Sequence, residues 1–197
     1  MKRKTFLKLY STIAAIPLFR KFPAMHLDDK LKNWAGNIEY STDNVFYPET
    51  AEDVRKLLLS KDKMRSLGTR HCFNRIADSK HNLVSSSKLN KVISFDAGAH
   101  TVTVEGGIKY GELAPFLQEK GFALHNLASL PHISVAGSIT TATHGSGVNN
   151  GNLASAVRAL EIIKPDWSVI TLSKGANAEF EGARVSFVAL GFFNSLT

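Results

Sequence analysis

The segment Ala128–Asn152, "ASLPHISVAGSITTATHGSGVNNGN", contains no Lys, Arg, Asp or Glu among its 25 residues. Exposed loops are usually charged and core segments are usually more apolar, so this composition suits neither place. Glycines let the backbone approach a ligand closely, and small hydroxyl side chains satisfy polar ligand atoms without adding charge. The segment therefore favours a buried polar ligand such as a large cofactor. A Gly/Ser-rich loop packed against itself is the alternative.

A second unusual stretch lies upstream, at Leu67–Asn74, "LGTRHCFN". Its glycine predicts a turn that presents His71 between Arg70 and Cys72, the only cysteine of the chain. A histidine beside a thiol suggests a metal site or a cysteine nucleophile. A histidine after a glycine turn suggests a cofactor contact or no role at all. A single cysteine cannot form an internal disulfide, so cysteine usage does not indicate the redox compartment.

Two other chemistries receive little support from the sequence. His125, His132 and His144 are separated by seven and twelve positions, with no carboxylate between them, which matches no compact metal motif. Ser129 and His132 lack the Gly-x-Ser-x-Gly pattern of a hydrolase nucleophile. We therefore expect neither a metal site nor a serine hydrolase.

The composition predicts a globular domain. The chain has 197 residues, of which 44% are hydrophobic, enough for a substantial core. Its 24 Lys and Arg against 17 Asp and Glu leave a formal charge of +7. Much of this excess lies in the first 22 residues, and no basic stripe with interleaved aromatic residues follows them. We therefore expect no nucleic-acid partner.

Residues 1–25 form a basic and apolar leader. Its apolar run from Leu9 to Phe19 is about half as long as a membrane span requires. The segment Arg3–Lys8, "RKTFLK", resembles the twin-arginine export motif, with Lys4 in place of the second arginine. A cleaved signal and an interfacial anchor both fit this pattern. We expect a periplasmic or membrane-associated protein, with a cytoplasmic location as the alternative.

The remainder of the chain alternates short strands and helices, which predicts an α+β fold. Residues 50–63 and 109–121 have the caps and amphipathic spacing of helices, and Gly121 suits the end of the second. Residues 91–107 read as a β-hairpin. Further expected elements are a strand at 64–68, a helix at 153–163, a turn at 164–168 and a strand at 169–174.

Four motifs in order carry a family resemblance: "NWAGN" at Asn33–Asn37, "LGTRHCFN", "EGGIKYGELAPFLQEKGFAL" at Glu105–Leu124 and "ASLPHISVAGSITTATHGSG" at Ala128–Gly147. Together they are similar to the PCMH-type FAD-binding domain of the vanillyl-alcohol oxidase superfamily, most of all to alditol (xylitol) oxidases and sugar-1,4-lactone oxidases. The resemblance covers residues 33–197. It implies two α+β subdomains with FAD held between them.

The resemblance also implies roles for individual residues. His71 matches the histidine that is linked covalently to the flavin 8α-methyl group, and Ser129 matches a residue that touches both cofactor and substrate. His132 is expected to hydrogen-bond flavin or substrate. The other cofactor-binding residues implied in this way are Gly68, Thr69, Arg70, Cys72, Phe73, Ser134, Gly137, Ser138, Thr141, Thr143, His144, Gly145 and, through its backbone, Phe193.

Two residues depart from the family pattern Gly-Ser-Gly-His-Ser, which here reads Gly68-Thr-Arg-His-Cys72. Arg70 replaces a glycine and so loses access to some backbone conformations, unless the turn does not need them. Its guanidinium has two possible fates, a pair with the FAD pyrophosphate or solvent. Cys72 replaces a serine and is expected to be a packed thiol.

The implied activity is oxidation of the CH–OH group of a polyol or sugar-1,4-lactone, with O₂ as the expected acceptor and another electron acceptor as the alternative. In the resembled oxidases a substrate domain follows the FAD domain. We expect that domain to be absent here, so no catalytic base is nominated. A truncated, non-catalytic flavin-binding remnant is the alternative function.

Overall fold

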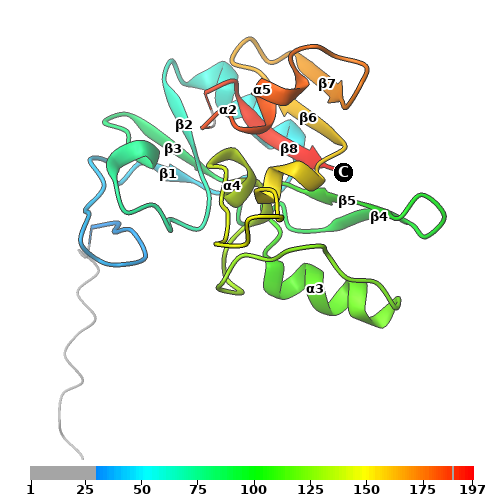
Figure 1. The fold of residues 1–197 in the computed structure, drawn as a ribbon. Helices are drawn as coiled ribbons and strands as arrows, with labels where there is room; N and C mark the ends of the chain where they lie inside the picture. Colours follow the sequence, from blue (N-terminus) through cyan, green and yellow to red (C-terminus); the bar gives the residue numbers. More distant parts are fainter. Residues whose placement is uncertain (1–29, 188) are drawn as a thin grey trace, which may run out of the picture.

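The computed structural model describes residues 30–187 and 189–197, so the leader of residues 1–25 lies outside the described chain. The described residues form a mixed fold with two sheets, as the α+β prediction required (Figure 1). Within these residues, no helix has the length and apolar character needed to cross a membrane.

The first sheet is parallel, with strand order β1-β3-β2. Its strands are β1 (Val45–Phe46), β2 (Met64–Leu67) and β3 (Asn82–Ser85). In the central strand, the consecutive residues Leu83 and Val84 are both buried and pack on opposite faces, as expected for a parallel sheet that is covered on both sides. β2 ends at Leu67, so the "LGTRHCFN" loop leaves from the carboxyl end of this sheet.

Helix α2 (Ala51–Ser60) connects β1 to β2 of the first sheet. Thr50 caps its first turn, and the Asp53 side chain accepts a hydrogen bond from the Thr50 backbone in return, so the predicted capping is confirmed. Val54 is fully buried and packs in one cluster with Val84 of the first sheet and Phe192 of the second. The helix stops at Ser60, three residues before the predicted end.

The second sheet is antiparallel, with strand order β4-β5-β8-β6-β7. The predicted hairpin is confirmed as β4 (Val92–Asp96) and β5 (Thr101–Glu105). The other strands are β6 (Ala159–Ile163), β7 (Val169–Ser173) and β8 (Phe192–Leu196). Helix α3 (Tyr110–Glu119) lies along the hairpin, and Gly121 follows it with the expected positive φ of 79° (Figure 1).

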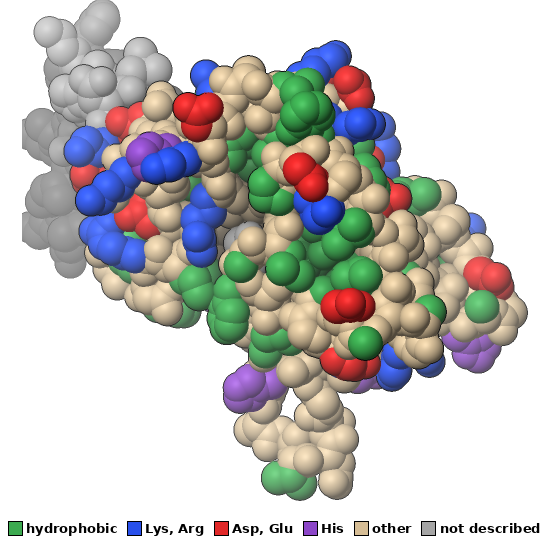
Figure 2. All heavy atoms as spheres, turned by 90° about the horizontal axis from the view of Figure 1, so that it is seen from above, with side chains coloured by type: hydrophobic (Ala, Val, Ile, Leu, Met, Phe, Trp, Pro, Cys, Tyr) green, Lys and Arg blue, Asp and Glu red, His purple; other side chains and the backbone are tan. Residues whose placement is uncertain are grey.

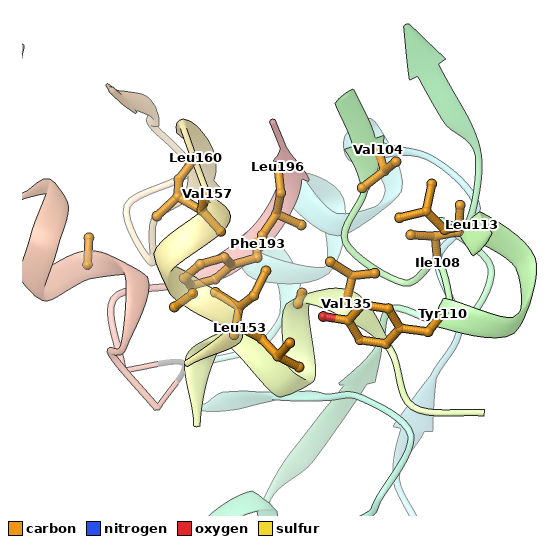
Figure 3. Close-up of a cluster of buried hydrophobic side chains, with 14 of the residues drawn as sticks. Val104, Ile108, Tyr110, Leu113, Val135, Leu153, Val157, Leu160, Phe193 and Leu196 are labelled. Atoms are coloured by element: carbon orange, nitrogen blue, oxygen red, sulfur yellow. The ribbon is translucent and has the colours of Figure 1, made fainter. Parts of the chain in front are cut away.

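The main core lies between this sheet and the helices that follow β5. Side chains from β5, α3, the C-terminal strand and residues 153–160 converge in it (Figure 3). The short helix α4 (Val135–Thr140) is buried along most of its length and lies centrally in the fold (Figure 1). The core therefore fixes the part of the uncharged segment around α4, whereas residues 144–151 are exposed.

The predicted helix at residues 153–163 is wrong. A 3₁₀ turn, η2 (Leu153–Ala156), is followed by strand β6, which pairs with both β7 and β8. Leu160 and Ile162 are buried on one face of this strand and Glu161 between them is not, which is the two-residue period of a strand. Pairing of β6 with a strand on each side outweighed the helix propensity of Ala154, Ala156 and Ala159.

The remaining short elements lie at the surface: the 3₁₀ turn η1 (Arg75–Ala77) and helix α5 (Phe180–Arg184). On the face shown in Figure 2, basic and acidic side chains occur together. None of these charged side chains comes from residues 128–152, which contain no Lys, Arg, Asp or Glu.

Candidate cofactor-binding site

The "NWAGN" turn holds the "LGTRHCFN" loop through its backbone. The side-chain amide of Asn33, a buried residue, donates to the carbonyl oxygen of Cys72 at 3.0 Å. The backbone N–H of Trp34 donates to the carbonyl oxygen of Arg70 at 2.8 Å. We call these two hydrogen bonds the Asn33–Trp34 clamp. They fix the loop on both sides of His71.

Arg70 adopts a left-handed backbone conformation with φ of 61°. Glycine reaches this region freely, whereas other residues pay about 1–2 kcal/mol. The turn therefore does require the conformation for which the family glycine is suited, and the arginine occupies it. The guanidinium donates to the carbonyl oxygen of Lys32 at 2.9 Å. It thus binds the protein backbone, which is neither of the two fates considered from the sequence.

Ser134 lies where the uncharged segment meets the "LGTRHCFN" loop. Its hydroxyl oxygen is buried and has no hydrogen-bond partner in the part of the chain that the structure describes. A Cβ atom built on Gly68 would lie 3.1 Å from this oxygen, and one built on Gly137 would lie 2.7 Å away. The Ser134 backbone N–H donates to the Thr69 hydroxyl at 3.3 Å. We call Gly68, Thr69, Ser134 and Gly137 the glycine–serine cradle.

The uncharged segment leaves helix α4 through a left-handed residue. Ala142 has φ of 52°, its N–H donates to the Ile139 carbonyl, and the N–H of Thr143 donates to the Ser138 carbonyl. This pair of bonds is the Schellman arrangement, in which glycine is the usual left-handed residue. The Thr141 hydroxyl donates back to Gly137 at 3.0 Å. Each predicted cofactor segment therefore contains a left-handed non-glycine residue, and His100, Trp167 and Phe187 outside them share this conformation.

Three aromatic rings surround His71 on the loop. Its ring lies 4.7 Å from that of Trp34, 5.3 Å from that of Phe73 and 5.4 Å from that of His132, measured between centroids. The Nδ1 atom of His71 is 3.4 Å from Nε2 of His132. We call these four residues the histidine cluster. Burial, and secondarily the charge of His132, lowers the pKa of His71, which favours its neutral and nucleophilic form.

Cys72 is a half-buried free thiol beside this cluster. Burial raises its pKa, although Arg65 acts in the opposite direction. A raised pKa keeps the thiol protonated at neutral pH, so Cys72 is a poor nucleophile. This chemistry agrees with the expected packed thiol.

The structure brings together only some of the residues implied by the resemblance. The loop from Gly68 to Phe73 and the start of α4 meet at the cradle and the cluster. Ser138 is committed to internal bonds, donating to the Val135 carbonyl at 2.8 Å and pairing with the Tyr110 hydroxyl at 2.9 Å. The Phe193 side chain is in the main core (Figure 3). The exposed residues Ser129, His144 and Gly145 stay predictions.

The contact between Trp34 and His71 was not predicted from the sequence. The "NWAGN" motif was the only signal for Trp34, and the number of residues between this motif and His71 does not indicate whether they touch. A cavity of about 370 Å³ between β5, α3 and α4 is lined by none of the predicted cofactor residues. Among the described residues, no three His, Cys, Asp or Glu side chains gather as metal ligands do.

The cradle fits a phosphate-bearing cofactor on its own chemistry. It offers an unpaired buried hydroxyl packed against two glycines, where a Cβ atom would crowd it, and neither segment contains a carboxylate that would repel phosphate. These features define an FAD-binding domain. The chain belongs to the FAD binding domain family, whose model matches residues 42–173.

Within that family, the chain is 44% identical over 168 residues to an alditol oxidase of Streptomyces sp., covering 84% of this chain and 40% of the relative. It is 32% identical over 173 residues to L-gulonolactone oxidase of Mus musculus, covering 85% and 39%. The chain thus spans about 40% of the length of these relatives. A solved structure of an alkyldihydroxyacetonephosphate synthase shares the fold, with a TM-score of 0.67 at 20% identity, covering 77% of this chain and 30% of that one.

Proposed function

We propose that the chain is the cofactor-binding part of an FAD-dependent oxidoreductase that oxidises the CH–OH group of a polyol or sugar-1,4-lactone. The 44% identity to an alditol oxidase and the 32% identity to L-gulonolactone oxidase support this substrate class. One structural observation carries the proposal: two segments without a carboxylate converge at the buried, unpaired Ser134 hydroxyl, and one of them also presents His71.

The residues of this chain bind and orient the cofactor, which supplies a ring able to accept two electrons. The Ser134 hydroxyl would hold a phosphate, and the glycines at positions 68 and 137 leave room for this hydroxyl. The exposed Ser129 contacts the substrate. No described residue is nominated as the base that removes the substrate proton.

His71 forms a covalent bond to the flavin 8α-methyl carbon in this proposal. The bond replaces one methyl hydrogen and the imidazole N–H hydrogen. The two hydrogens leave as two protons and two electrons, which reduce dioxygen to hydrogen peroxide. Dioxygen is also the proposed acceptor during turnover. The lowered pKa of His71 supports this role, because the neutral imidazole has the free electron pair that the bond requires.

The covalent link is tested by denaturing the chain in acid after incubation with FAD. We expect yellow flavin to stay with the wild-type protein and with Cys72→Ala, the matched control on the same loop. We expect His71→Ala to bind FAD but release all of it in acid. Acid-stable flavin in His71→Ala, or none in the wild type, would refute the link through His71.

The substrate class is tested on the product of the full gene. We expect peroxide formation with xylitol, sorbitol or sugar-1,4-lactones in air. Flavin reduction by these compounds without peroxide would instead indicate a different electron acceptor. No flavin reduction by any of them would refute the substrate class.

We also propose that residues 1–25 direct the protein to the periplasm or to a membrane surface. The support is the sequence alone, six basic residues and no acidic one in the first 22 positions. Cell fractionation of the full chain and of a chain lacking residues 1–25 tests this proposal. Equal recovery of both in the cytoplasm would refute it.

A further inference from the structure

The contact between His71 and His132 joins the two segments of the site through their side chains. The two nitrogens are 3.4 Å apart, at the limit of a hydrogen bond. His132 immediately precedes the buried Ile133 and Ser134, so its backbone is fixed at the cradle. His71 is fixed by the Asn33–Trp34 clamp. The contact therefore joins two positioned rings.

Trp34 packs against His132 as well as against His71. The two rings are stacked, with centroids 5.6 Å apart and an angle of 17° between their planes. The indole also lies 4.7 Å from the His71 ring, and 53% of Trp34 is exposed. A side chain so exposed contributes little to the core. Its contacts orient the two imidazoles.

A hydrogen bond between two imidazoles constrains their protons. One nitrogen must carry hydrogen and the other must offer an electron pair, so the bond ties the tautomer of each ring to that of the other. Two imidazolium ions at this distance would repel each other, so the pair resists double protonation. A covalent bond to carbon needs one nitrogen of His71 with a free electron pair.

We propose that His132 is a positioning residue for His71, holding it as a neutral imidazole in one tautomer and one orientation ready for attachment to the flavin. This inference rests on the proposed function, because the positioning of His71 serves its attachment to the flavin. The hydrogen bond itself exists without cofactor, so it is measurable in the flavin-free chain.

The first test is nitrogen NMR of the ¹⁵N-histidine-labelled chain without FAD. We expect the His71 ring of the wild type to show one predominant tautomer. His132→Phe keeps a ring against Trp34 but removes the hydrogen bond, and we expect both His71 tautomers to appear. His132→Gln retains an amide able to hydrogen-bond and should restore part of the preference. His81→Gln, an exposed histidine outside the cluster, should match the wild type.

The second test is the rate at which added FAD becomes acid-stable. His132→Phe should still bind FAD but attach it at least about tenfold more slowly. This factor is below the roughly 10²–10⁴-fold that a side chain acting as general acid or base contributes. An unchanged His71 tautomer in His132→Phe, or attachment at the wild-type rate, would overturn the proposal. If the wild type binds FAD without attaching it, the covalent link is refuted, and the NMR result alone decides the role of His132.

Discussion

Replacing Ala142 with glycine tests the left-handed turn that ends helix α4. The residue has φ of 52° and is half-buried. Glycine removes a backbone cost of about 1–2 kcal/mol. It adds about 0.5–1 kcal/mol of conformational entropy to be lost on folding, and it removes a half-buried methyl group worth about 0.4 kcal/mol. These terms nearly cancel, so we expect stability within about 0.5 kcal/mol of the wild type.

Ala114→Gly is the matched control. Ala114 is also half-buried but lies in the right-handed interior of α3, where glycine gains nothing and costs about 1 kcal/mol. With the lost methyl contact, we expect a destabilisation of about 1.4 kcal/mol. The gap between the two variants, about 1–2 kcal/mol, equals the left-handed cost at Ala142.

Urea unfolding followed by circular dichroism measures both free energies of unfolding. A gap of about 1.5 kcal/mol corresponds to about 3–6 °C in Tm for a chain of this size. Equal losses in the two variants would mean that Ala142 is not left-handed, and the Schellman arrangement at the end of α4 would then be wrong. The backbone N–H groups of Ala142 and Thr143, which donate its two hydrogen bonds, would then also lack protection from hydrogen exchange.

Three further predictions concern other positions. Arg70→Gly and Arg70→Ala both lose the bond to Lys32, so we expect the glycine variant to be more stable by about 0.5–1 kcal/mol in urea, and the reverse order would contradict the observed φ. Burial alone would raise the pKa of Asp78, but its hydrogen bonds lower this pKa on balance. The ionised Asp78 therefore stabilises the fold above pH about 4, and this stabilisation is lost as the pH falls through the lower folded-state pKa. We expect Asp78→Asn to lose less stability between pH 7 and pH 3 than the wild type. Gly107→Ala would drive its Cβ into the carbonyl oxygen of Ser86 and should cost at least about 1–3 kcal/mol, whereas Gly182→Ala, with open space in α5, should cost nothing, and a similar thermal shift in both would refute this packing.

The sequence predicted those parts of the fold whose signals are local. Thr50 and Gly121 marked helix ends because capping depends on a few neighbouring residues. The helix expected at 153–163 failed because Ala159–Ile163 is short and apolar, and such a run fits a strand or a helix until its partners are known. Those partners, β7 and β8, come later in the chain.

The candidate site was predictable in its segments but not in its contacts. The uncharged composition of residues 128–152 and the glycine turn before His71 identified the two segments before any geometry was known. The approach of His71 to His132, across 61 positions, depends on how β2 and α4 are oriented by the core. The outcome at Arg70 had the same cause, because its carbonyl and guanidinium both bond to residues of a third segment, Trp34 and Lys32.

The Asn33–Trp34 clamp has a practical consequence for the boundaries of this domain. The match to the FAD binding domain family begins at residue 42, after the clamp. A chain shortened to that boundary keeps His71 and the whole cradle but loses two hydrogen bonds to the loop and the ring that stacks on His132. The working unit therefore extends further toward the N-terminus than the region shared across the family. An expressed domain that starts at residue 30 retains the clamp that holds the His71 loop, and one that starts at residue 42 does not.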